Sequence, residues 1–335
     1  MTSQSSEVKG PKRFSDAGEL TGEKPTREFA EIKIPVPWGH ISGKWYGPQD
    51  IRPILGLHGW LDNAGTFDNL VPLLAPNVAF LSIDLPGHGL SSRLPDGCYY
   101  NVIDNLVVIR MIMNQYQWKK VSLIGHSMSG IIAFLFAAIF PDKTESIISI
   151  DALKPHMRSA EKAISSMASR LEEFLIEDER NQSVIEPPSY TYDELIEKLN
   201  HGSFYSVERN NCKYMLARNI QRSEKDPEKY FFCRDRRVMF YNYAVAPQEV
   251  VVEMAKKITA PHMFIKARSS IYFEDKKYYD QVMEILMPKE NFEYVEANGT
   301  HHLHLNNPKD IVDDVNKFIE RYGPKREVRA ATSKL

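Results

Sequence analysis

Short apolar runs alternate with amphipathic stretches along most of the chain. Residues 29–36 and 39–46 alternate between apolar and polar positions, which is typical of two half-exposed strands joined in a hairpin. Further runs are short and mostly apolar, as in strands that are buried on both faces; they lie at 53–57, 78–83, 121–124, 146–151 and 261–267. Residues 291–296 are predicted to form the last strand. Stretches with helical spacing separate most of these runs. They are 66–74, 101–116, 131–140, a stretch that ends at Leu286, and 310–322.

Strands that alternate with helices predict an α/β fold with a mostly parallel, eight-stranded sheet and helices on both faces. In such a sheet the carboxyl ends of the strands gather at one edge, and reactive groups are expected in the loops there. His58, Asp84, Ser127 and Asp151 each fall at the end of a predicted strand. The sequence therefore predicts that this edge carries the chemistry.

The pattern changes in residues 152–257, between two predicted strands. This stretch is charged, rich in Tyr, Phe and Met, and helical in character, with clear helices at 159–176 and 192–199. It is too long for a simple crossover connection. We therefore expect a helical cap at 152–257, inserted over the sheet.

The remaining boundaries follow from the same pattern. They are a polar, disordered arm at 1–26, a core made of 27–151 and 258–323, and a C-terminal tail at 324–335 that carries a targeting signal.

Residues 125–130, Gly-His-Ser-Met-Ser-Gly, follow a buried strand and precede the apolar helix 131–140. A serine in this position stands on a sharp turn with its hydroxyl above the sheet edge, where the helix N-terminus can stabilise an oxyanion. The usual pattern is G-x-S-x-G, but this chain has Ser129 in place of the second glycine and Gly130 one position later. We interpret this as a tolerated departure, because small residues are what the close packing of strand and helix requires. The motif predicts Ser127 as a nucleophile; a strand–helix turn without chemistry is the alternative.

A serine hydroxyl needs a base to accept its proton and an acid to orient that base. His301, His302 and His304 follow the last predicted strand, and His301 comes directly after the tight turn at 299–300. We expect His301 to be the base and the other two to pack the loop. The run does not predict a zinc site, because no acidic residue lies among these histidines in the sequence.

The acid is expected in the loop after the strand that ends near Ala267. Glu274 is the first choice, Asp275 the second, and Asp151, at the end of the preceding strand, the third. Each of them can equally be an ordinary surface carboxylate. The order nucleophile, acid, histidine is the one expected for this type of sheet.

Backbone N–H groups are expected to form the oxyanion hole. They belong to Met128, directly after the nucleophile, and to Trp60, after His58-Gly59. His58, Asp84 and His88 are expected to hold loops rather than to take part in chemistry.

Four motifs in this order resemble those of the α/β-hydrolase superfamily. They are His58-Gly59-Trp60-Leu61-Asp62-Asn63, Asp84-Leu85-Pro86-Gly87-His88-Gly89, Gly125-His126-Ser127-Met128 and Gly299-Thr300-His301-His302-Leu303-His304. The residues of these motifs are most similar to those of the serine hydrolase-like, or kraken-like, branch, and the similarity covers about residues 28–323. The resemblance implies a Ser–acid–His hydrolase under a helical cap, with Ser127 as nucleophile and His301 as base. An aspartate nucleophile, as in dehalogenase and epoxide hydrolase relatives, is absent.

The composition limits the partners. The chain has 335 residues, 43% hydrophobic and 26% charged, with a net charge of −2 and both signs scattered, so nothing points to nucleic acid or a membrane surface. It has no apolar run long enough for a membrane span and no secretory signal at its polar start. Cys98, Cys212 and Cys233 are too few and too scattered for a disulfide framework, and we expect reduced thiols in an intracellular protein. No cofactor is expected.

The last three residues, Ser333-Lys334-Leu335, match the peroxisomal import address, which a receptor reads at a free C-terminus. We therefore expect an import receptor as partner and a location in peroxisomes, in the cytoplasm, or in both. A solvated tail with an accidental ending is the alternative.

The leading hypothesis is a serine hydrolase that cleaves a carboxylic ester or thioester through an acyl-enzyme intermediate. The aromatic and Met content of 152–257 favours an apolar acyl or aromatic substrate. The alternative is a non-catalytic small-molecule binding protein that retains the α/β-hydrolase fold.

Overall fold

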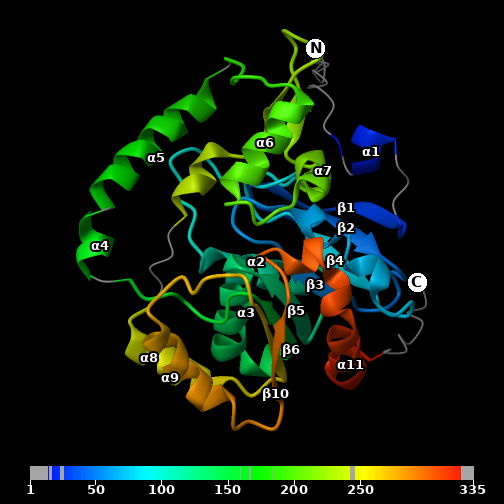
Figure 1. Ribbon diagram of the computed structural model, residues 1–335, viewed down its shortest axis with the longest axis vertical. Helices are drawn as coiled ribbons and strands as arrows, with labels where there is room; N and C mark the ends of the chain where they lie inside the picture. The colour runs from blue at the N-terminus through cyan, green and yellow to red at the C-terminus, as the bar shows by residue number, and fades with distance from the viewer. Residues whose placement is uncertain are drawn as a thin grey trace, which may run out of the picture.

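A single mixed sheet forms the centre of the computed structural model, which describes residues 14, 17–22, 26–158, 160–165, 167–183, 185–241 and 246–325 (Figure 1). The sheet has eight strands in the order β1-β2-β4-β3-β5-β6-β9-β10. Their bounds are β1 Phe29–Val36, β2 Gly39–Tyr46, β3 Ile54–Leu57, β4 Phe80–Ile83, β5 Val121–His126, β6 Thr144–Ile150, β9 His262–Ala267 and β10 Phe292–Ala297. β2 pairs antiparallel with β1 and with β4, and all other pairs are parallel. The predicted eight-stranded, mostly parallel sheet is confirmed.

The register of the parallel strands brings their ends together. Leu57 in β3 lies opposite Gly125 in β5, and His126 lies opposite Ile150 in β6. The loops that follow β3, β5 and β6 therefore leave the same edge of the sheet side by side.

The two faces of the sheet are covered by different helices, because successive side chains of a strand point to opposite faces. Leu123 in β5 packs in the cluster that includes residues of the helices on one face, and the next residue, Ile124, packs in the cluster that includes Val315 and Phe318 on the other. The first face carries α2 (Asp104–Gln115), α3 (Met128–Ile139), α8 (Gln248–Lys257) and α9 (Lys276–Leu286), and the second carries α11 (Val312–Tyr322). A buried Phe or Leu side chain in such a layer contributes about 1.5–3 kcal/mol.

The helix expected at 66–74 does not form. Its place is taken by two 3₁₀ turns, η1 (Ala64–Phe67) and η2 (Val71–Leu73). Pro72 lies in η2 and has no N–H to donate to the preceding turn, so a continuous α-helix would be interrupted there.

The segment between β6 and β9 is mostly helical. It contains α4 (Ala160–Ser165), α5 (Met167–Gln182), α6 (Tyr192–Gly202), η4 (Arg209–Asn211), α7 (Cys212–Ala217), β7 (Ile220–Arg222), β8 (Tyr230–Phe232), η5 (Arg236–Phe240) and α8. α8 packs on α3 and α9 in the layer that covers the sheet. Val251 and Ala255 of α8 are buried in the core cluster of that layer, so the expected cap boundary at residue 257 is too late and α8 belongs with the core.

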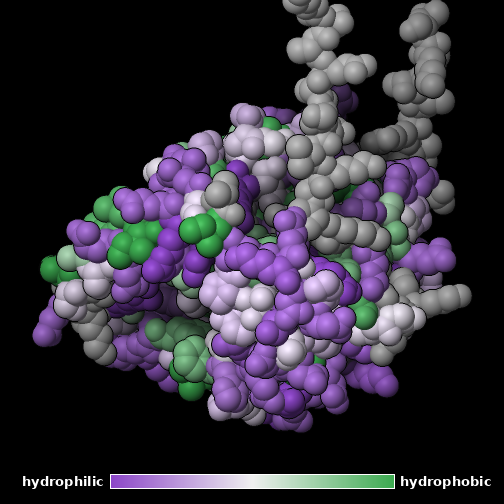
Figure 2. Space-filling model, turned by 90° about the horizontal axis from the view of Figure 1, so that it is seen from above, coloured by the Kyte–Doolittle hydropathy of each residue, from purple (hydrophilic) through white to green (hydrophobic). Residues whose placement is uncertain are grey.

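α4 and α5 stand at one side of the molecule and present apolar side chains to solvent (Figures 1 and 2). Ile164, Met167, Leu171 and Leu175 are each more than half exposed. Their spacing of three or four residues places them along one side of the two helices.

The expected disordered arm is wrong for the part that the structure describes. Residues 17–21 form α1 (Ala17–Thr21), which packs on α7, and the ring of Phe14 lies 6.0 Å from that of Tyr230. The rest of the arm lies outside the described residues. So do Ser333, Lys334 and Leu335.

None of the helices in the described part of the chain is long and apolar enough to cross a membrane. α10 (Leu303–Asn306) and η6 (Pro308–Asp310) complete the chain between β10 and α11, and η3 (Pro141–Lys143) joins α3 to β6.

Candidate active site

Ser127 stands on a strained turn between β5 and α3. Its φ of 52° and ψ of −118° are unusual for a residue with a side chain. The flanking glycines explain how the turn closes: a Cβ on Gly125 would lie 2.0 Å from the carbonyl oxygen of Ser129, and one on Gly130 would lie 2.1 Å from that of Ala152. The backbone therefore leaves no room for a side chain at either position, and the turn lifts the Ser127 hydroxyl above the sheet edge.

The imidazole of His301 lies between a hydroxyl and a carboxylate. Its Nε2 is 2.7 Å from Oγ of Ser127, and its Nδ1 is 2.5 Å from Oδ2 of Asp151. An ionised carboxylate can only accept, so Nδ1 carries the proton and the lone pair of Nε2 faces the hydroxyl. This is the tautomer that a general base for Ser127 requires.

Asp151 is buried and bonded on both oxygens. Oδ1 accepts hydrogen bonds from the ammonium group of Lys266 at 2.7 Å and from the backbone N–H of Ala267 at 2.9 Å, while Oδ2 faces His301. Burial by itself raises the pKa of Asp151, but the hydrogen bond from His301 and the charge of Lys266 outweigh it, so that the pKa lies below its ordinary value. Asp151 is therefore a carboxylate at neutral pH.

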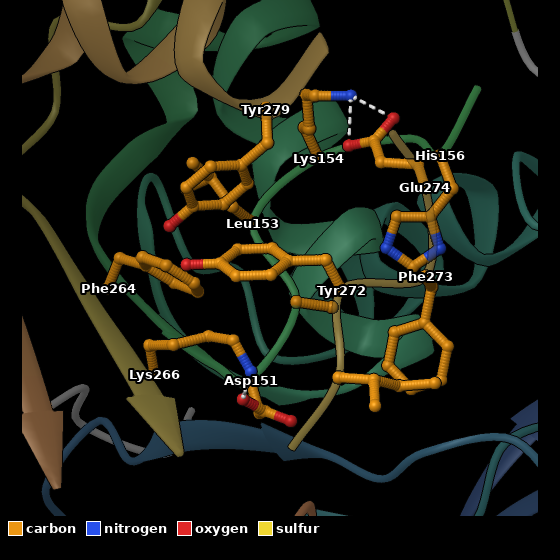
Figure 3. A pocket seen from close by; sticks show the side chains of 12 residues that line it. Asp151, Leu153, Lys154, His156, Phe264, Lys266, Tyr272, Phe273, Glu274 and Tyr279 are labelled. Atoms are coloured by element: carbon orange, nitrogen blue, oxygen red, sulfur yellow. Dashed lines mark hydrogen bonds and ion pairs between the residues drawn. The ribbon is translucent and has the colours of Figure 1, made fainter. Parts of the chain in front are cut away.

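The expectation that Glu274 lies beside the base is wrong. Its carboxylate forms a buried ion pair with Lys154, at 2.5 Å, and accepts the backbone N–H of Met157 at 2.8 Å. Figure 3 shows this pair and the Lys266–Asp151 pair as separate groups in the same pocket. Asp275, the second choice, accepts the N–H of Lys277 at the start of α9. Of the three candidate acids, only Asp151 contacts His301.

The loop after β3 lies against the turn that carries Ser127. The hydroxyl of Ser129 donates to the carbonyl oxygen of His58 at 2.5 Å. Ser129 is thus not merely a small substitute for glycine: it ties the turn to the loop that carries Trp60. The indole N–H of Trp60 donates to the carbonyl oxygen of Val238 at 2.7 Å, which anchors the same loop to η5. Met128 begins α3 directly after Ser127.

His58, Asp84 and His88 lie beneath these loops. His58 accepts the N–H of Leu85 at 2.9 Å, and Asp84 accepts the N–H groups of Ala64 and Leu90. Such contacts suit the loop-holding role expected of these residues. No pattern in the sequence indicates the buried cation that Asp84 needs.

That cation is Arg218, whose side chain is fully buried. Its guanidinium group reaches Asp84 at 2.6 Å and Glu31 at 2.7 Å. Arg218 follows α7 and is separated from both partners by more than 130 residues, so no local pattern could have identified the contact.

Asp62 lies among the histidines, and sequence reasoning missed it. Its Oδ2 is 3.1 Å from Nδ1 of His126, and its Oδ1 is 3.3 Å from Nε2 of His302. The argument against a zinc site was that no acidic residue lies among these histidines in the sequence. That argument is wrong for the folded chain, where Asp62 contacts His126 and His302. Asp62 precedes His302 by 240 residues, and only the folded sheet brings them together. The ring of His304 packs on that of His126, with centroids 4.2 Å apart, while its Nε2 lies 2.8 Å from Oγ1 of Thr66.

The comparisons with known proteins agree with this geometry. The profile of the α/β hydrolase fold family matches residues 52–308. A protein of Drosophila melanogaster named probable serine hydrolase is 35% identical over 306 residues, which cover 90% of each chain. A serine hydrolase-like protein of Danio rerio is 31% identical over 318 residues, which cover 93% of this chain and 94% of that one. Among solved structures, a hypothetical protein from Pseudomonas aeruginosa superposes with a TM-score of 0.73 at 25% identity, covering 87% of this chain and 98% of its own. The chain belongs to the α/β-hydrolase superfamily, in its serine hydrolase-like branch, and is a hydrolase.

Proposed function

We propose that the protein is a serine hydrolase that cleaves a carboxylic ester or thioester, with Ser127 as nucleophile, His301 as base and Asp151 as the acid that orients it. The observation that supports this most strongly is the position of the His301 imidazole, at 2.7 Å from the hydroxyl and 2.5 Å from the carboxylate. A pure binding site has no need for this alignment.

In the first half of the reaction, Oγ of Ser127 attacks the carbonyl carbon and its proton passes to Nε2 of His301. The N–H groups of Trp60 and Met128 receive the oxyanion of the tetrahedral intermediate. The intermediate collapses to an acyl-enzyme, and His301 returns the proton to the departing alcohol or thiol. In the second half, water attacks the acyl carbon and loses a proton to His301. The bond from the acyl carbon to Oγ of Ser127 then breaks, His301 returns the proton to that oxygen, and the acid is released.

Apolar side chains around the site support an apolar acyl or aromatic substrate. The ring of Phe273 lies 5.1 Å from that of His301 and stacks at 5.4 Å on His156. Phe273 and Ile271 are 47% and 72% exposed, respectively, so apolar surface beside the base is open to a ligand. Trp60, 41% exposed, adds a further ring on the loop proposed for the oxyanion hole.

A fluorophosphonate probe tests the proposal because an activated serine displaces its fluoride and becomes phosphonylated, whereas an ordinary serine does not react. Wild type should be labelled, and Ser127→Ala should not. Ser129→Ala is the matched control: this serine is buried two residues further on, donates to a carbonyl and has no base, so labelling should persist. A folded wild type that resists the probe would favour the alternative, a non-catalytic small-molecule binding protein.

We also propose that Ser333-Lys334-Leu335 direct the protein to peroxisomes through their import receptor, with the cytoplasm as the location of any protein that is not imported. A fluorescent domain fused to the N-terminus should appear in peroxisomes, and deletion of Leu335 should leave it diffuse. A diffuse full-length fusion in cells that import a control cargo would overturn this part of the proposal.

A further inference from the structure

The ring of His126, directly before the nucleophile, faces two groups that can only accept hydrogen bonds. Nε2 lies 3.0 Å from the carbonyl oxygen of His301, and Nδ1 lies 3.1 Å from Oδ2 of Asp62. A neutral imidazole has one N–H and can satisfy only one of these acceptors. With Nε2–H on the carbonyl, the Nδ1 lone pair faces a carboxylate.

His302 completes a set of inward-facing donors. Its Nδ1 lies 2.7 Å from Oγ of Ser206, which leaves Nε2 directed at Oδ1 of Asp62, 3.3 Å away. One ligand atom from each of Asp62, His126 and His302 lies within 4.8 Å of the other two. All three side chains are more than 90% buried.

Gly59 packs closely against two of these side chains. A Cβ on Gly59 would lie 2.7 Å from Nδ1 of His126 and 2.9 Å from Oδ2 of Asp62. Both distances are shorter than an ordinary Cβ contact, so a side chain at position 59 would disturb both donor atoms and glycine does not.

We propose that Asp62, His126 and His302 bind a divalent transition-metal ion, Zn²⁺ in the first place. Two imidazole nitrogens and one carboxylate oxygen form a donor set that Zn²⁺ accepts, with the fourth position left to a solvent molecule. In a metal-binding histidine, the ring nitrogen that does not bind the metal usually hydrogen-bonds to a backbone carbonyl or another polar oxygen. Here Nε2 of His126 faces the carbonyl oxygen of His301, and Nδ1 of His302 faces the hydroxyl of Ser206. A cation also removes the conflict between the His126 lone pair and the Asp62 carboxylate.

The ion would connect three segments of the active site. Asp62 belongs to the loop after β3, His126 ends β5, and His302 follows the proposed base. Its binding is a property of these side chains and does not depend on whether Ser127 is a nucleophile. Because the ligands converge only in the folded chain, the ion should stabilise the fold.

The experiment uses the full chain without a histidine tag, treated with a chelator and then dialysed. Titration with Zn²⁺, and with Co²⁺ as a coloured substitute, should show one ion bound per chain with a dissociation constant on the order of micromolar or tighter. At a Zn²⁺ concentration 100 times the dissociation constant, the melting temperature should rise by roughly 4 °C or more. Asp62→Asn and His302→Gln should each weaken binding by more than about 100-fold, because loss of a ligand exceeds the 10–100-fold effect of an outer partner.

His262→Gln is the matched control, since His262 is a buried histidine on β9 that bonds to Ser149, and the affinity of this variant for Zn²⁺ should equal that of wild type. If a ligand variant fails to fold, Ser206→Ala replaces it; loss of the partner of His302 should weaken binding by about 10-fold. Wild type without stoichiometric binding, or equal affinities in wild type and Asp62→Asn, would overturn the proposal and leave a shared proton between His126 and Asp62 as the occupant.

Discussion

The ammonium group of Lys266 lies 2.7 Å from Oδ1 of Asp151, so the carboxylate that contacts His301 also holds a buried lysine. In the proposed reaction His301 becomes positively charged, and Asp151 must then serve two cations at once. Lys266 also donates to the carbonyl oxygens of Ala267 and Ser270, which fix its position. The lysine therefore orients Asp151 and opposes the charge that develops on the base.

Lys266→Met should move the acid limb of the pH profile of kcat/KM to higher pH. Lys266 and His301 contact the two oxygens of the same carboxylate, so removal of the positive charge of Lys266 makes the protonated imidazole more favourable. Lys266→Arg keeps the charge and should leave the limb near its wild-type position. A folded Lys266→Met variant with an unchanged profile would show that the charge of Lys266 does not reach the base.

Asp151→Asn should lower kcat by on the order of 10³–10⁴-fold, because an amide at this position favours the wrong tautomer of His301. Glu274→Gln is the matched control: it leaves Lys154 without its buried partner and should lower the melting temperature, yet kcat should stay within about tenfold of wild type. Steady-state rates on a chromogenic ester, with both melting temperatures recorded, distinguish the two carboxylates. A larger loss of kcat in Glu274→Gln would reverse the assignment.

Ser129→Gly, which restores the usual motif, should lower the free energy of unfolding by about 1 kcal/mol. The change removes the hydrogen bond from Ser129 to the carbonyl oxygen of His58 and leaves that buried acceptor without this donor. Ser129→Ala should show a similar loss, since it removes the same bond. Denaturant unfolding measures both, and a glycine variant as stable as wild type would mean that the bond contributes nothing net.

Arg218→Met should destabilise the fold by about 3–5 kcal/mol at neutral pH, because Asp84 would remain as a buried, unpaired charge. Burial raises the pKa of Asp84, but Arg218 outweighs it and holds the pKa below its ordinary value. A carboxyl whose pKa is lower in the folded state stabilises the fold above its unfolded pKa and loses that contribution as the pH falls.

The unfolding free energy of wild type should therefore decrease below about pH 4, whereas Arg218→Met should lack the contribution of Asp84 to this decrease. Urea unfolding at pH 7 and at pH 4 gives the comparison. Equal losses on acidification in both proteins would contradict the role given to the Asp84–Arg218 pair.

Local patterns were sufficient for much of the fold. Alternation located β1 and β2. Short apolar runs located strands such as β3, β5 and β9, because strands buried on both faces leave a continuous apolar signature. Periodicity was less reliable where a single residue changes the backbone: Pro72 divides a helical pattern into 3₁₀ turns. Periodicity also assigned α8 to the cap. The amphipathic pattern of a helix does not show whether the helix packs on the sheet or belongs to an insertion, and α8 packs in the core.

In the site, the sequence by itself determined Ser127 and His301 as partners to be tested, since each follows a predicted strand in a short, recognisable turn. The folded chain decided which carboxylate meets His301. Glu274 had the expected position in the order of loops, but a buried Lys154 holds it, and Asp151 reaches the imidazole from the end of β6.

The tertiary structure alone placed Asp62 against His126 and His302, and Arg218 against Asp84. These contacts join residues from 64 to 240 positions apart. Hydrophobic periodicity records which face of an element is buried, but not which polar group from a distant loop will meet another. The order and register of the strands determine that pairing, and it forms only when the strands have assembled into the sheet.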